Sequence, residues 1–397
     1  MSCRFTIATL CFISFALRNL YFGEYKRVMK VLLVGNYVND EQESMQRFAN
    51  LLQTGLSRAG HEVRLLRPMP FIGRIRPAAK GVGKWLGYVD KFVIFPRQLK
   101  IAARWADIIH ICDHSNAFYV KYVSSRPHTV TCHDLLAISS ALQEVPEWRT
   151  SWTGRHLQRL ILRGLRKARH VICVSEATRT ELIRLAGLPG QNVSLIYNGL
   201  NYSYVPLLET DGKMSTGDPL TSRPFLLHVG GNQWYKNRLG VLKIFTHLRG
   251  MIPSPEMNLI MVGKPWTDEM RKFVSSNGLH DRVIELTNIS NEDLRALYSK
   301  ATALLFPSLR EGFGWPIIEA QACGCPVFTS DRVPMTEVGG DAAIYLDPAD
   351  PHGAATVIAN SLERFPQLRR AGLENVKRFS PAAMISSYSR LYEQLAA

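Results

Sequence analysis

The chain has 397 residues, of which 46% are hydrophobic, and it carries a formal net charge of +15. The composition is that of an ordinary globular protein, which excludes a disordered chain, and the length suggests about two domains. The charge indicates an anionic partner, which is a phosphorylated small molecule, an acidic membrane surface or nucleic acid. The seven cysteines lack the spacing of zinc ligands, so they are expected to be core residues in a reducing compartment.

The first 28 residues differ in character from the rest of the chain. Arg4 and the apolar run 5–17 resemble the charged and hydrophobic regions of a secretory signal, but no small-x-small cleavage site follows. The apolar run is also too short to span a bilayer. Because Met29 directly precedes a strand-like run, we expect residues 1–28 to be a non-native or signal-like extension. A weak membrane anchor is the alternative.

From Met29 onward, short runs rich in Val, Ile and Leu alternate with longer segments of helical periodicity. This pattern predicts the α/β class, with parallel sheets covered by helices on both faces. We expect a first domain at 29–205, a breaker-rich linker at 206–224 and a second domain at 225–375, with a cleft between the domains. Residues 376–397 are expected to form a helix that packs back on the first domain. The predicted strands are 31–34, 62–66, 107–111, 129–132, 170–174, 193–197, 225–229, 259–262, 283–286, 303–306, 326–328 and 343–346.

Ligands of open parallel sheets bind at the carboxyl ends of the strands, so the loops there are where chemistry is expected. Five of these loops are unusual in composition. They are 35–37, 133–134, 230–232, 263–264 and 307–311.

The segment 306–326 combines a strand end, a glycine-punctuated loop with Glu311, and Pro316 at an expected first helical position. Glu319 then lies one turn inside the helix. A helix start directs free N–H groups and a positive dipole end at a ligand, which suits a diphosphate, and carboxylates accept hydrogen bonds from paired sugar hydroxyls. The segment therefore indicates a nucleotide-sugar site. The alternative is that Glu311 is a solvated loop residue and Glu319 only complements the helix dipole.

Residues 307–320 resemble the Glu-x7-Glu signature of the family 4 retaining glycosyltransferases, which have the GT-B fold of two facing Rossmann-like domains. Segments 323–327 and 337–343 continue the family pattern, and 171–177, 197–199 and 294–298 match it upstream. The resemblance covers nearly the whole chain from Met29 and is strongest over 225–348.

The resemblance implies roles for the residues of the second domain. Glu311 would contact the donor sugar, Glu319 the ribose, and Lys236 the diphosphate. An arginine is expected where this chain has Gly231, and Arg238 or Lys264 is the candidate substitute. The backbone around the donor would come from the two loops and the helix start, at Gly230, Gly231, Phe313, Gly314, Trp315 and Pro316.

In the first domain, the resemblance places His133 against the donor sugar, and Asp134 is expected to orient His133 or to meet the acceptor. Without the resemblance, both residues are equally explained as caps of a following turn. The family has a Gly-Gly loop after the first strand, where this chain has only Gly35.

No Asp-x-Asp motif occurs, so no metal and no cofactor beyond the donor are expected, and Lys236 with the helix end would replace the metal. The chain also lacks Gly-x-Gly-x-x-Gly, which argues against a dinucleotide oxidoreductase.

Basic residues gather in two segments. Arg155, Arg159, Arg163 and Arg166 form one stripe of a predicted helix, and 74–100 mixes cations with Trp85, Tyr88, Phe92 and Phe95. This composition favours the headgroup region of an anionic membrane, and a solvated basic face is the alternative. No nucleic-acid-binding motif is found, so nucleic acid is not expected as a partner.

These observations predict a cytoplasmic enzyme, peripheral on the membrane face, that transfers a hexose with retention of configuration. The expected donor is a nucleotide-diphosphate sugar, with mannose from GDP-mannose favoured by analogy. The expected acceptor is a saccharide or a polyprenyl-diphosphate-linked saccharide of cell-surface polysaccharide or lipopolysaccharide synthesis. The alternatives are a nucleotide-sugar epimerase and a non-catalytic scaffold of the same architecture.

Overall fold

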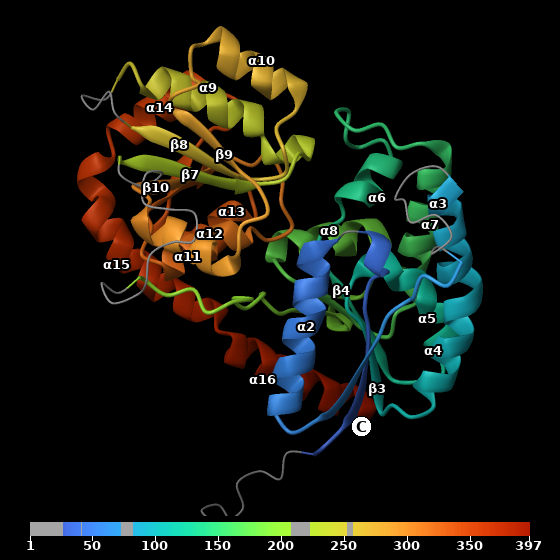
Figure 1. The fold of residues 1–397 in the computed structure, drawn as a ribbon. Coiled ribbons are helices and arrows are strands. Elements are labelled where there is room, and N and C mark those ends of the chain that lie inside the picture. Colours follow the sequence, from blue (N-terminus) through green and yellow to red (C-terminus); the bar gives the residue numbers. More distant parts are fainter. Residues whose placement is uncertain (1–26, 41, 73–81, 208–222, 252–256) are drawn as a thin grey trace, which may run out of the picture.

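The computed structural model describes residues 27–40, 42–72, 82–207, 223–251 and 257–397 (Figure 1). Outside these ranges lie most of the expected extension 1–28, most of the expected linker 206–224, Arg74, Arg76 and two of the seven cysteines. The other five cysteines are buried and free. In the described ranges, none of the helices combines the length and apolarity needed to cross a bilayer.

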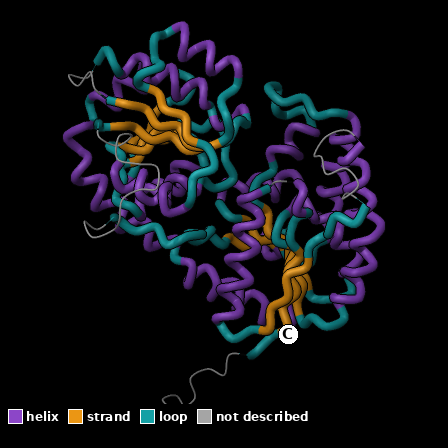
Figure 2. The backbone as a smooth tube through the Cα atoms, in the orientation of Figure 1, coloured by secondary structure: helices purple, strands orange, loops and turns teal. Residues whose placement is uncertain are grey.

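Two six-stranded sheets form the framework (Figure 2). Every strand pair in both sheets is parallel. The first sheet has the order β2-β1-β3-β4-β5-β6 and the second β12-β11-β10-β7-β8-β9. All twelve predicted strands are present, which confirms the α/β class. Their bounds are β1 Lys30–Val34, β2 Glu62–Leu66, β3 Ile108–Ile111, β4 His128–Cys132, β5 Val171–Cys173, β6 Val193–Leu195, β7 Phe225–Gly230, β8 Asn258–Gly263, β9 Val283–Leu286, β10 Ala303–Phe306, β11 Val327–Ser330 and β12 Ile344–Leu346.

Helices cover both faces of each sheet, as the continuous apolar strands require. The central strands β3, β4, β10 and β11 are buried along their whole length, whereas the edge strands β2 and β9 are partly exposed. The α-helices of the first unit are α2 Glu43–Arg58, α3 Val82–Val89, α4 Phe95–Ala103, α5 Val120–Val123, α6 Leu136–Ala141, α7 Trp152–Lys167 and α8 Glu176–Ala186. Those of the second are α9 Arg238–Leu248, α10 Asp268–Ser276, α11 Asn291–Lys300, α12 Trp315–Ala322, α13 Met335–Gly339, α14 Pro351–Ala359 and α15 Phe365–Asn375.

The last helix, α16 Pro381–Ala396, leaves the second unit and packs on the first (Figure 1). Its apolar side chains join one core cluster with residues of β1 and α2. Two tyrosines of α16 also bind the sheet through polar contacts, since His110 lies 2.6 Å from the Tyr392 hydroxyl and Thr131 lies 3.2 Å from that of Tyr388.

The strand order fixes where ligands are expected. In each sheet the chain starts at an inner strand and later crosses to its other side, so a switch point lies between β1 and β3 and another between β7 and β10. Loops diverge at such points and leave room for a ligand at the carboxyl ends. The loops at 35–40, 112–115, 230–237 and 307–314 are therefore the ones on which the site depends.

Candidate functional site

The loop after β10 leads into α12 through a glycine that the backbone requires. Gly314 is the N-cap of α12 and has a φ of +103°, which L side chains rarely adopt. The helix begins at Trp315, one residue before the predicted start, with Pro316 in its first turn. The Phe313 side chain is buried against Phe379, at 5.6 Å between ring centroids, so only its backbone is available to a ligand.

Lys236 and Glu311 form an ion pair at the second switch point. The Nζ of Lys236 lies 2.7 and 2.9 Å from the two Glu311 carboxylate oxygens, and the two side chains are 19% and 9% exposed. The loops that carry them are joined by a hydrogen bond from Leu309 N to Tyr235 O (2.7 Å). Asn237, with a φ of +53°, donates to the carbonyl of Pro307 (3.1 Å). The pair is thus held by loops that constrain each other.

Glu319 lies on the buried side of α12. It accepts a hydrogen bond from the Tyr298 hydroxyl (2.9 Å). Burial raises the pKa of Glu319 to about 7, although the Tyr298 hydrogen bond and the charges of Arg47 and Lys236 act in the opposite direction. At neutral pH this carboxyl can therefore accept or donate a hydrogen bond.

Gly230 is the last residue of β7, and the loop that follows contains Gly231 and leads to a buried arginine, Arg238. The Nη1 of Arg238 donates to the carbonyl of Lys264 (2.7 Å) and to the Asn232 side chain. The Nε and Nη2 of Arg238 are buried and have no hydrogen-bond partner. Two unpaired donors on a buried cation are what an anionic ligand would satisfy. Lys264, the other candidate, is exposed and lies 3.4 Å from Glu43 of α2.

His133 follows β4 and is buried. Its Nε2 donates to the carbonyl of Cys112 (2.9 Å), and its ring meets Phe48 edge-on at 4.6 Å. A carbonyl can only accept, so Nε2 carries the proton, and burial lowers the pKa of His133 and keeps it neutral. The expectation that Asp134 orients His133 is corrected. The Asp134 carboxylate accepts from Leu136 N (3.1 Å), and Cys112 holds the imidazole instead.

A polar cluster at the first switch point was not found from the sequence. Asp113 is buried and pairs with His114 (3.1 Å), and its carboxylate accepts from Asn36 Nδ2 (2.5 Å) and Ser115 N (3.0 Å). Burial acts to raise the pKa of Asp113, but the hydrogen bond and charge of His114 outweigh burial and hold that pKa well below its usual range. The signal was available, because Asp113 and His114 follow a buried strand as His133 does. Gly35, beside Asn36, is buried against the Arg67 side chain.

The two units meet through direct contacts of these loops. The Ser175 hydroxyl at the start of α8 lies 2.8 Å from the carbonyl of Gly312, and the Thr178 hydroxyl lies 3.3 Å from the same oxygen. A Cβ atom on Gly312 would lie 1.9 Å from the carbonyl of His133. Trp315 adds a hydrogen bond from its indole to the carbonyl of Gly199 (3.1 Å). The segment with Glu311 is thereby fixed against the loop with His133.

In the described ranges, no group of three or more His, Cys, Asp or Glu side chains is placed to hold a metal ion. Lys236 pairs with Glu311, and the charges of Arg47 and Lys236 act on Glu319, so both units contribute cations to these carboxylates. The arrangement can bind an anion beside polar groups that recognise hydroxyls.

Known proteins resemble the chain along both units. The family model "Glycosyltransferase Family 4" matches residues 45–204, and "Glycosyl transferases group 1" matches residues 217–377. An O-antigen chain mannosyltransferase B of Escherichia coli is 28% identical over 72% of this chain and 75% of its own length. The O-antigen chain mannosyltransferase RfbU of Salmonella typhimurium is 29% identical over 61% and 62%.

A solved structure shares the fold. The Anabaena protein HepE, in complex with UDP and glucose, superposes with a TM-score of 0.71 at 17% identity, over 92% of this chain and 99% of its own. Two parallel sheets with their carboxyl-end loops in contact, and one family model on each unit, lead to one conclusion. The chain belongs to the family 4 glycosyltransferases, which are hexose-transferring enzymes of the GT-B fold.

Proposed function

We propose that the enzyme transfers mannose from GDP-mannose to a saccharide or polyprenyl-diphosphate-linked saccharide in cell-surface polysaccharide synthesis, such as that of lipopolysaccharide. The names of the two bacterial relatives, both O-antigen mannosyltransferases, support the sugar and the pathway class. The complex of HepE with UDP and glucose supports a nucleotide-sugar donor. The proposed location is the cytoplasm, at the membrane surface.

The observation that carries the proposal is the Lys236–Glu311 pair, which is followed two positions along the chain by a buried arginine with two unpaired donors. Lys236 and Arg238 supply two positive charges for the donor diphosphate, and Arg238 takes the place of the arginine missing at Gly231. When the diphosphate engages Lys236, Glu311 is released to accept hydrogen bonds from the donor sugar. Glu319 receives the ribose hydroxyls.

The backbone completes the donor site. The amide of Gly230 lies at the end of β7, and those of Phe313 and Gly314 lie in the loop before α12; Gly230 and Gly314 have no side chain of their own. The start of α12 adds its positive dipole end to the charge of Lys236. These groups stabilise the diphosphate most strongly as it departs with its full negative charge.

On the opposite side, neutral His133 offers its Nδ1 as an acceptor for a donor-sugar hydroxyl, and Asp134 faces the acceptor. Transfer proceeds by attack on the same face as departure. The bond from the anomeric carbon to the diphosphate oxygen breaks, the acceptor oxygen bonds to that carbon, and the acceptor proton passes to the leaving phosphate oxygen. In this arrangement Glu311 is engaged by hydroxyls of the donor sugar, which disfavours it as a nucleophile for double displacement.

The alternatives fit less well. The curated relatives described above are transferases, which favours transfer over epimerisation. In a scaffold that binds no ligand, a buried guanidinium with unpaired nitrogens would only lower the free energy of unfolding, because its buried donors stay unsatisfied.

The test is a thermal-shift screen of the full chain against GDP-mannose, UDP-glucose, UDP-galactose and the free nucleotides, because a ligand of the native state raises the midpoint. GDP-mannose should produce the largest shift. Incubation of the selected donor with and without a saccharide acceptor then separates the functions. Transfer to the acceptor supports the proposal, whereas a changed sugar without acceptor supports the epimerase.

A further inference from the structure

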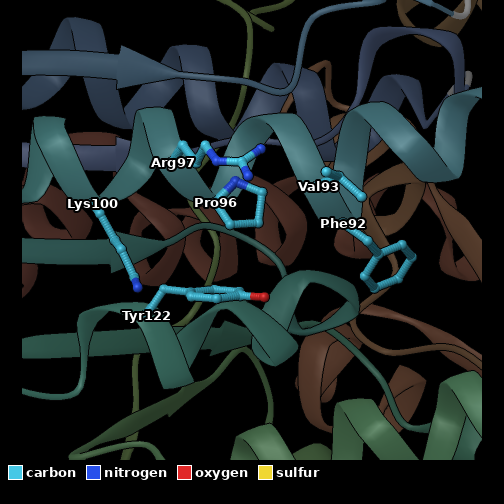
Figure 3. A pocket seen from close by; sticks show the side chains of 6 residues that line it. All are labelled: Phe92, Val93, Pro96, Arg97, Lys100 and Tyr122. Atoms are coloured by element: carbon cyan, nitrogen blue, oxygen red, sulfur yellow. The ribbon is translucent and has the colours of Figure 1, made fainter.

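The outer side of the first unit has a basic and apolar pocket. It has a volume of about 260 Å³ and lies between the segment that precedes α4, α4 itself and α5 (Figure 3). Of the aromatic residues expected in the headgroup region, Phe95 does not lie there, because it is buried against Tyr119. The pocket residues are Phe92, Val93, Pro96, Arg97, Lys100 and Tyr122.

Apolar side chains are exposed beside the cations of this pocket. Val93 is 49% exposed and Ile101 is 68% exposed. The spacing of Val93, Arg97, Lys100 and Ile101 puts them on one side of the helix, and both cations are exposed. The ammonium of Lys100 lies 5.5 Å from the Tyr122 ring centroid (Figure 3). A row of exposed aliphatic groups with cations and a tyrosine matches the needs of a lipid headgroup layer.

The helices that surround the pocket carry charges of one sign. Helices α4, α5 and α7 carry eight lysines and arginines, namely two, one and five, and no aspartate or glutamate. Because α5 contacts both α4 and α7, these helices form one layer on the sheet. Arg159, Arg163 and Arg166 of α7 are exposed, and Trp152 at its start is 69% exposed. We call the exposed side of this layer the basic face.

The basic face connects to the interdomain site through the residues before Phe92. Tyr37, in the loop after β1, donates its hydroxyl to Asp90 (3.1 Å). Lys91 pairs with Asp40 of the same loop (2.7 Å). The pocket therefore begins directly after residues that hold the loop at the first switch point, on the side where the acceptor is proposed to bind.

We propose that the basic face binds the surface of an anionic phospholipid bilayer, with a lipid phosphate in the pocket between Arg97 and Lys100 and with Val93, Ile101 and Trp152 entering the headgroup layer. Exposed aliphatic groups favour a bilayer over nucleic acid or a soluble anion, which gain nothing from them. This surface deepens the proposed function and rests on it, because a lipid-linked acceptor would be reached at the bilayer.

The test measures sedimentation of the full chain with vesicles of phosphatidylcholine alone or of equal parts phosphatidylcholine and phosphatidylglycerol. The protein should bind the anionic vesicles, and salt should weaken binding. The variant Arg97→Glu/Lys100→Glu should bind at least about tenfold more weakly. Arg97→Gln/Lys100→Gln has the same side-chain shape as the Glu variant without the negative charges, guards against a local folding defect, and should show intermediate binding.

Two further variants separate the contribution of apolar contacts from that of the overall charge of the protein. Val93→Ser/Ile101→Ser should weaken binding without changing its salt dependence, because it removes apolar contacts only. Lys272→Glu/Arg370→Glu changes the net charge by the same amount on exposed positions of the second unit, and should bind like the unchanged protein. Equal binding to neutral vesicles, or an equal loss in this control, would overturn the proposal.

Transfer from GDP-mannose to a water-soluble acceptor is measured with the same variants. It should be unchanged in Arg97→Glu/Lys100→Glu, since neither side chain belongs to the donor site. If neither the variants nor the unchanged protein transfers mannose, but the unchanged protein still binds anionic vesicles, the donor assignment is wrong and the proposed bilayer-binding surface is supported. If transfer persists and vesicle binding is absent, the bilayer surface fails.

Discussion

Replacing Lys236 with Met should separate the two roles of the Lys236–Glu311 pair, which are to stabilise the fold and to bind the donor diphosphate. The pair is short, at 2.7 Å, and both side chains are largely buried. Removing one partner of a fully buried pair costs about 3–5 kcal/mol, and an exposed pair contributes about 0–1 kcal/mol. For this pair we expect a loss of about 2 kcal/mol, because Glu311 is left unpaired. For a unit of this size, this corresponds to a fall in the thermal midpoint of about 4–8 °C.

The assay is thermal unfolding of the full chain with and without GDP-mannose. The ligand-dependent rise in midpoint should disappear in Lys236→Met, because the diphosphate loses a counter-charge. The double variant Lys236→Met/Glu311→Gln should recover much of the stability but none of the ligand response, since no unpaired charge remains.

Lys264→Met is the matched control. Lys264 pairs with Glu43 at 3.4 Å, but these side chains are 55% and 65% exposed, so the midpoint should change by less than about 2 °C. An unchanged midpoint in Lys236→Met, or a ligand response equal to that of the unchanged protein, would refute the reasoning.

Arg238→Met should weaken binding of GDP-mannose about tenfold or more in calorimetry, because a charge-assisted hydrogen bond is worth about 1.5–3 kcal/mol. Unchanged affinity would show that Arg238 does not take the place of the arginine missing at Gly231. Glu319→Gln should flatten the pH dependence of stability. The pKa of Glu319 in the folded state, about 7, exceeds the ordinary 4.5, so the free energy of unfolding of the unchanged protein falls as pH rises through this interval. The fall is up to about 3 kcal/mol. Parallel pH profiles of the two proteins in denaturant titration would contradict this. Gly312→Ala should reduce kcat strongly in steady-state assays, because its Cβ meets the carbonyl of His133 at 1.9 Å, whereas Gly190→Ala, with open space around it, should behave like the unchanged protein.

The sheets were predictable because their signal is local. A buried parallel strand is a continuous apolar run bounded by turn residues, and such runs occur at all twelve positions. The loops of the candidate site were predictable for a related reason, since the loops with Lys236 and Glu311 follow β7 and β10, which are neighbours at a switch point.

The remaining parts of the site depend on contacts that local patterns do not contain. Ser175 and Gly312 are 137 positions apart, and their contact exists only because the two units are placed face to face. His133 is oriented by the backbone carbonyl of Cys112. Because every residue has such a carbonyl, the sequence does not reveal this contact, and it pointed to the neighbouring carboxylate of Asp134, which binds Leu136 N instead. Asp113 differs in that its place after the buried strand β3 is visible in the sequence, whereas its contact with Asn36, 77 positions away, is not.

The central claim is that Glu311 serves transfer from a nucleotide sugar, and the most direct measurement compares Glu311→Gln with the unchanged full chain in transfer of labelled mannose from GDP-mannose to a saccharide acceptor. The substitution keeps the shape of the side chain and removes the charge that faces Lys236. The account predicts a fall in kcat of about 100-fold or more, with GDP-mannose still raising the thermal midpoint. Equal turnover by the two proteins would contradict it.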